Sequence, residues 1–80
     1  MTNDETLAND SLALAEEIAA DARREIARLD ALIVDATAAQ DFDVVGFLLL
    51  EKSFEEFRVG NAEQMRAAAL EFKSCVGQRH

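Results

Sequence analysis

Few residues of this chain could carry chemistry, and their spacing is poor for it. The sequence has one cysteine, Cys75, and one histidine, His80, five residues later. A nucleophilic thiol needs a lowered pKa and a neighbouring base. Cys75 falls near the C-terminal end of a predicted helix, where the partial negative charge disfavours the thiolate. Its helical spacing with Phe72 predicts a small buried core residue instead. We therefore expect no catalytic residue and a protein that is not an enzyme.

The carboxylates offer no metal site by their spacing. Structural zinc needs four ligands, which one cysteine and one histidine cannot supply. Di-iron helical bundles use Glu-x-x-His pairs on inward helix faces, and the sequence has no such pair. Glu25 lies near the edge of an apolar helical stripe, but Arg28 follows one turn later and favours an ion pair. No metal, no cofactor and no small-molecule substrate is inferred.

One tripeptide, Asp10-Ser11-Leu12, resembles the site at which acyl carrier proteins hold their phosphopantetheine arm. That family is small, acidic and helical, and the resemblance would make Ser11 the attachment point. In the family, however, a complete helix and a long loop precede the modified serine. Only ten residues precede Ser11 here. The resemblance is therefore limited to three residues, and no cofactor is expected from it.

The charge of the chain restricts its partners. The formal net charge is −8, and most of the acids lie in the first 40 residues. Nucleic acid and anionic membranes are bound through positive surfaces, so we expect neither as a direct partner. The longest apolar run, Val44 to Leu50, has seven residues, against the roughly 20 needed to span a bilayer. The first ten residues lack the pattern of a signal peptide, which predicts a cytoplasmic protein.

Composition predicts an all-α fold, because the chain has no proline, three glycines and abundant alanine, leucine, glutamate and arginine. We expect one domain, 1–80, with residues 1–10 and 78–80 frayed. Three helices are predicted, at about 12–38, 41–58 and 61–76: one long N-terminal helix followed by a helical hairpin. The first helix would be longer than the other two, so a dimer that completes a bundle is the simplest closure.

Local signals set the bounds of these helices. The first has an apolar stripe over about six turns: Leu14, Ile18, Ala22, Ile26, Leu29, Leu32, Ile33 and Ala36. Asp41 can cap the second helix, and Asp43 falls in its first turn, where an acid is favoured. Gly60 suits the left-handed residue that ends a helix, and Asn61 suits the cap of another. A break at Gly60 is therefore predicted.

The segment Val44 to Phe57 holds most of the large apolar side chains. Four of them share one helical stripe and are predicted to form the core: Phe47, Leu50, Phe54 and Phe57. Val45, Leu48 and Leu49 lie away from the centre of that stripe and are predicted to bind a partner. The leading hypothesis is a small acidic interaction module, either a homodimeric adaptor or a co-chaperone for another protein. The alternative is an acidic inhibitor or antitoxin that mimics nucleic acid and blocks a basic cleft.

Overall fold

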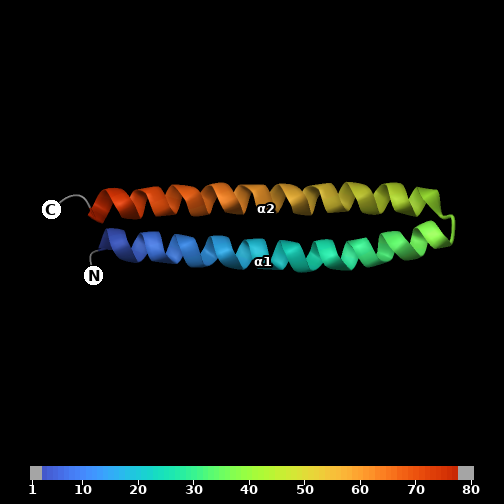
Figure 1. Cartoon of the computed structure of the whole chain (residues 1–80), viewed down its shortest axis with the longest axis horizontal. Coiled ribbons are helices and arrows are strands. Elements are labelled where there is room, and N and C mark those ends of the chain that lie inside the picture. Colours follow the sequence, from blue (N-terminus) through green and yellow to red (C-terminus); the bar gives the residue numbers. More distant parts are fainter. Residues whose placement is uncertain (1–2, 78–80) are drawn as a thin grey trace.

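The computed structural model describes residues 3–77, which form a hairpin of two antiparallel helices (Figure 1). Helix α1 spans Asn3–Ala38 and helix α2 spans Phe42–Gly77, with 36 residues each. The molecule is a rod of 62 × 14 × 12 Å. The prediction of an all-α chain is confirmed, but the prediction of three helices is wrong. Residues 1, 2 and 78–80 lie outside the described part of the chain.

The turn between the helices closes with a left-handed residue that is not glycine. Gln40 has φ 59°. Its N–H donates to the Thr37 carbonyl, and the Asp41 N–H donates to the Ala36 carbonyl, both at 3.0 Å. These two bonds satisfy the last carbonyls of α1 in the pattern usually made by a C-terminal glycine. The chain reverses within three residues, and the two helices lie side by side.

Asp41 caps α2, as the sequence predicts. Its Oδ1 accepts from the Val44 N–H at 3.5 Å, and its carbonyl accepts from the Val45 N–H at 3.0 Å. Asp43 lies in the first turn of α2, where an acid interacts favourably with the helix dipole. Local chemistry therefore fixes where α2 begins.

Helix α2 continues through Gly60, where a break is predicted from the sequence. Val59 is half-buried and Ala62 is buried, so the same face of α2 meets α1 on both sides of the glycine. Gly60 has no positive φ. A glycine inside a helix costs about 1 kcal/mol relative to alanine. The burial of side chains on both sides of Gly60, which an unbroken helix preserves, stabilises the hairpin by more than this. Within residues 3–77, the left-handed ending predicted at Gly60 is absent, and so is a third helix.

Helix α1 begins at Asn3, nine residues before its predicted start. The added turns matter because Ala8 is only 1% exposed. The added turns of α1 also pack against the C-terminal part of α2, where Val76 is 7% exposed. The sequence-based start missed this pairing because it assumed that residues 1–10 would fray. The fraying of residues 1, 2 and 78–80 stays a prediction.

Most of the fully buried residues between the helices are alanines. Among the described residues, the buried hydrophobic ones are Ala8, Ala15, Ala19, Ala22, Leu29, Leu48, Ala62, Ala69 and Val76. Many of these recur at intervals of seven along each helix, the period that keeps one face of a helix against a partner. Of the larger side chains among them, only Leu29 is below 2% exposed. The core is therefore thin, and large apolar side chains are left over.

Ion pairs along the edges match the acidic α1 to cations of α2. Lys52 Nζ lies 2.8 Å from Asp30, and Arg58 lies 3.1 Å from Asp21. The four cationic and acidic groups are partly or largely exposed, so each pair adds little stability. These ion pairs help to specify the antiparallel orientation of the two helices and their register, because shifting or reversing α2 would separate the opposite charges.

Candidate interaction surface

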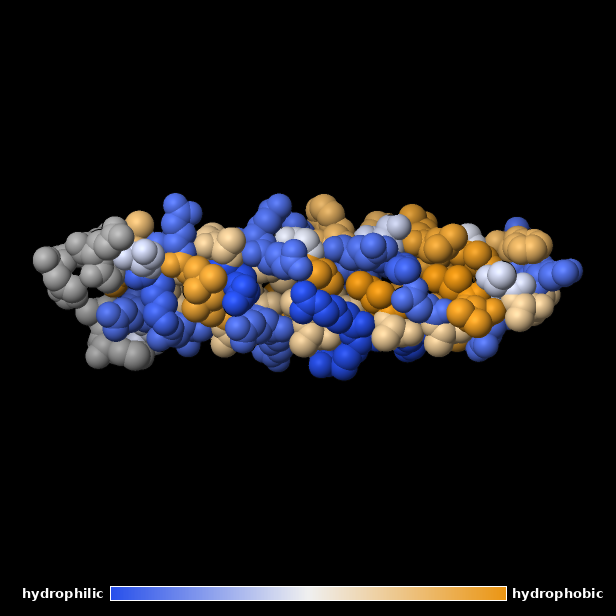
Figure 2. All heavy atoms as spheres, in the orientation of Figure 1, coloured by the Kyte–Doolittle hydropathy of each residue, from blue (hydrophilic) through white to orange (hydrophobic). Residues whose placement is uncertain are grey.

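A stripe of large apolar side chains on α2 is left uncovered by α1. We call it the outer stripe: Phe47, Leu50, Phe54 and Phe57, which are 61%, 55%, 61% and 69% exposed. Their spacing of three, four and three residues places them along one line of the helix. Figure 2 shows hydrophobic residues gathered mainly over the half of the visible face nearer the turn. The surface is therefore most apolar around the first half of α2.

The outer stripe was predicted to be the core, and that prediction is wrong. The face of α2 that packs on α1 is the one containing Leu48, which is 8% exposed, and Val45, which is half-buried. Both faces have apolar residues at helical spacing, and the sequence favoured the one with the larger side chains. The face with small residues is the one that fits against the alanines of α1.

The three residues predicted to bind a partner do not form one surface. Leu48 lies between the helices, Val45 is half-buried beside it, and Leu49 is 48% exposed. Leu49 alone of the three presents much of its side chain to solvent. Binding of a partner by these residues stays a prediction, and within the hairpin Leu48 is a packing residue.

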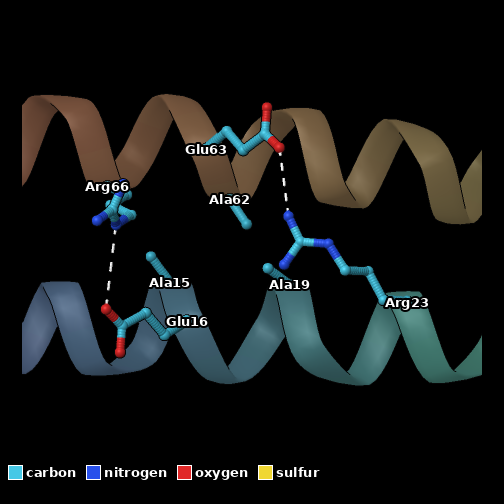
Figure 3. A pocket seen from close by; sticks show the side chains of 7 residues that line it. All are labelled: Ala15, Glu16, Ala19, Arg23, Ala62, Glu63 and Arg66. Carbon is cyan, nitrogen blue, oxygen red and sulfur yellow. Dashed lines mark hydrogen bonds and ion pairs between the residues drawn. The ribbon is translucent and has the colours of Figure 1, made fainter.

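The small interface residues leave a groove between the helices. A hollow of about 530 Å³ is lined by Ala15, Glu16, Ala19, Arg23, Ala62, Glu63 and Arg66. Figure 3 shows the charged side chains bridging it, with Arg23 on Glu63 at 3.3 Å and Arg66 on Glu16 at 4.0 Å. Each charge thus has an opposite partner from the other helix. The groove holds no cysteine, histidine or serine that could act as a nucleophile or base.

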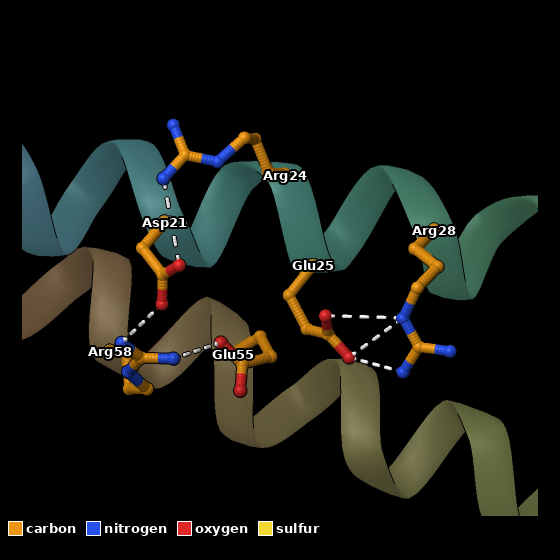
Figure 4. A network of polar contacts seen from close by, with 6 residues as sticks. All are labelled: Asp21, Arg24, Glu25, Arg28, Glu55 and Arg58. Carbon is orange, nitrogen blue, oxygen red and sulfur yellow. Dashed lines mark hydrogen bonds and ion pairs between the residues drawn. The ribbon is translucent and has the colours of Figure 1, made fainter.

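A network of charges lies farther along the hairpin (Figure 4). Arg58 of α2 contacts Asp21 of α1 at 3.1 Å and Glu55 of its own helix at 2.7 Å. Asp21 also lies 3.6 Å from Arg24. The network joins the two helices with alternating charges and leaves Arg58 held from two sides.

The ion pair that the sequence predicts within α1, between Glu25 and Arg28, is present. Arg28 binds the Glu25 carboxylate one turn away, and Arg24 pairs with Asp21. The hydrogen bond from Arg28 lowers the pKa of Glu25 below its ordinary value. Hydrogen bonding to Asp30 raises the pKa of Lys52, and hydrogen bonding to Asp21 raises the pKa of Arg58. All these shifts favour the charged forms, which is the behaviour of structural ion pairs and not of a general acid or base near neutral pH.

The remaining candidates for chemistry are Cys75, His80 and Ser11. Cys75 is exposed, so its prediction as a buried core residue is wrong. It lies on the solvent side of α2 because Val76, its neighbour, takes the inward position. His80 falls outside the described residues. Ser11 lies within α1 and is half-buried.

Neither described helix contains a segment long and apolar enough to cross a membrane. Within residues 3–77, no three His, Cys, Asp or Glu side chains gather in a way that could hold a metal ion. Comparisons with protein-family models, with curated proteins and with solved structures found no match to this chain. The exposed apolar surface of α2 is the feature that calls for a functional explanation.

Proposed function

We propose that this protein acts by protein–protein association, as a homo-oligomeric adaptor or a co-chaperone-like module, and that the outer stripe is its docking surface. The observation that carries the proposal is the exposure of four large apolar side chains, 55% to 69% each, along one line of α2. Soluble monomers rarely expose large contiguous apolar patches, and such patches mark interaction sites. The spacing of the outer stripe suits a partner helix laid along α2.

The hairpin gives this surface a rigid support. Packing of Leu48 on α1 holds one side of α2, and the ion pairs of Lys52 and Arg58 hold its edges. The outer stripe therefore projects from a helix whose position is already fixed. A preformed apolar surface costs little ordering when a partner binds.

A second candidate function rests on the acids of α1. Asp10, Glu17 and Asp35 are exposed, so α1 presents negative charge to solvent. An inhibitor or antitoxin that mimics nucleic acid would use such charges against a basic cleft. Other acids of α1, including Asp21 and Asp30, are engaged by cations of α2. That engagement favours a structural role for part of the acidic charge, and the alternative gives the outer stripe no role.

Capture from the source cell, compared between variants, separates the two functions. The bait would be the tagged chain, and the double variant Phe47→Gln with Phe57→Gln would lack half of the outer stripe. Val34→Gln is the matched control, because Val34 is 67% exposed but lies on α1. We expect capture of a protein, or of an untagged copy, to be lost in the double variant alone and to resist 0.5 M salt. Capture that survives the double variant but is lost in Glu17→Gln with Asp35→Asn, and in salt, would contradict the proposal and favour mimicry.

A further inference from the structure

We propose that the outer stripe is covered by a second copy of this chain, with the two α2 helices packed antiparallel about a two-fold axis that passes between them at the level of residues 52 and 53. This inference rests on the proposed function and names the partner. Each α2 then lies between its own α1 and the α2 of the partner subunit. A helix that is apolar all round in its first half needs two covered sides, and this arrangement supplies both.

The outer stripe is complementary to itself when reversed. Phe47 and Phe57 each lie five residues from Lys52, and Leu50 and Phe54 each lie two residues from it. In an antiparallel pair, Phe47 therefore faces Phe57 of the partner subunit, and Leu50 faces Phe54 of the partner subunit. A two-fold interface requires a patch that matches itself in this way.

Polar residues end the outer stripe at equal distances from the same centre. Asp43 and Asn61 continue its line in the two directions, and each lies nine residues from Lys52. Both are exposed. In the antiparallel pair, Asp43 faces Asn61 of the partner subunit, so an acid meets an amide that can donate a hydrogen bond to it. The seam therefore closes with polar contacts at both ends.

Small residues flank the outer stripe with the same symmetry. On the line of α2 next to the outer stripe, a small residue recurs every seven positions. These residues are Gly46, Ser53 and Gly60, and Ser53 is the central one. The hairpin itself gives no reason for the glycines, because neither has a positive φ and a Cβ on either would meet nothing within 4 Å. Glycine destabilises a helix relative to alanine. In the antiparallel pair, Gly46 faces Gly60 of the partner subunit, and the lack of side chains lets the two helices approach closely.

The exposed area fits an interface of this size. The chain exposes 5723 Å², whereas a compact monomer of 8.8 kDa exposes about 4,800 Å². The excess is close to the roughly 800 Å² that each chain buries in a standard interface.

The distribution of charge between the two helices also favours pairing through α2. Helix α1 has nine acids and three arginines, while α2 has six acids and four cations, so pairing through α2 keeps the two acidic helices outermost and apart.

Disulfide trapping tests the register. Ser53→Cys would be oxidised mildly in a chain that also has Cys75→Ser, so that one thiol remains. Ala67→Cys in the same background is the matched control, because Ala67 is exposed and lies two heptads later on the same line. Residues 53 and 67 are about 21 Å apart along the helix, so the two copies of residue 67 lie about 40 Å apart in the antiparallel pair. We expect covalent dimers from Ser53→Cys alone. Dimers from both variants would mean parallel packing, and dimers from neither would mean another interface; each would overturn the proposal.

Sedimentation equilibrium of the full chain tests the partner. We expect twice the chain mass of 8.8 kDa for the wild type and for Val34→Lys. Phe54→Lys should stay helical by far-UV circular dichroism but weaken dimerisation at least ~30-fold, the loss typical of a central interface residue. The added lysine lowers the net negative charge, so repulsion between the net charges of the two chains cannot explain dissociation. A monomeric wild type whose capture of another protein still requires the outer stripe would overturn this inference and leave the proposed function intact. A monomer whose capture ignores the outer stripe would overturn both.

Discussion

Leu29→Ala measures how much the thin interface between α1 and α2 contributes to folding. Leu29 is 1% exposed, so the substitution removes almost all of its buried surface. Burial of a leucine side chain is worth about 1.5–3 kcal/mol, and the remaining cavity adds to the loss. The rod is only 12–14 Å across, so neighbouring side chains can close part of the cavity. We expect a loss of about 2–3 kcal/mol, against roughly 4–12 kcal/mol for a whole chain of this length.

Urea denaturation followed by far-UV circular dichroism provides the measurement, at equal chain concentration because the proposed dimer would make stability concentration-dependent. Leu14→Ala is the matched control, since it makes the same change on the same helix at a side chain that is 51% exposed. Its loss should be about 1 kcal/mol or less. Equal shifts of the two midpoints, or a larger shift for Leu14→Ala, would show that α1 packs on α2 through another face and would refute the reasoning.

Three further changes test local features. Gly60→Ala, made in the Phe54→Lys chain to remove association, should raise the free energy of unfolding by about 0.8–1 kcal/mol because α2 is helical there; a decrease would indicate a left-handed Gly60. Gln40→Gly should stabilise by roughly 1 kcal/mol, since Gln40 has φ 59°, and a loss in the same urea assay would contradict that account. The Arg28 hydrogen bond lowers the pKa of Glu25 from 4.5, so its stabilisation is present above pH 4.5 and is lost as pH falls through the lowered pKa. Glu25→Gln should therefore lower the urea midpoint at pH 7 and leave it unchanged near pH 2; an equal effect at both would refute the ion-pair explanation.

Features decided within one turn of helix could be predicted from the sequence. The cap at Asp41 and the pair of Glu25 with Arg28 depend on residues three or four positions apart, and both are present. Helical composition gave the all-α class for the same reason. Such interactions need no knowledge of what lies across the interface.

Features that depend on the opposite helix were not predicted. Gly60 carries a local signal for a helix end, but α1 is long enough to keep α2 packed on both sides of it. The choice between the two apolar faces of α2 depended on the shape of α1, whose fully buried residues are mainly alanines. The face of α2 with Leu48 and Ala62 is the buried one, and small side chains on α1 let the two helices lie close together, whereas a face of phenylalanines would hold them apart. The seven-residue spacing of the alanines was the available signal, and it was missed because alanine buries little area.

The central structural claim is that α2 is one uninterrupted helix that leaves the outer stripe uncovered. The most direct test is the distance between spin labels on Cys75, near the C-terminal end of α2, and on Ala39→Cys, in the turn just before α2 begins; both positions are exposed. Labelled chain would be diluted with unlabelled chain, so that only distances within one chain are recorded. An unbroken α2 predicts about 50 Å between the two backbone positions. A distance below about 20 Å would mean that the chain turns back at Gly60, and it would contradict the account.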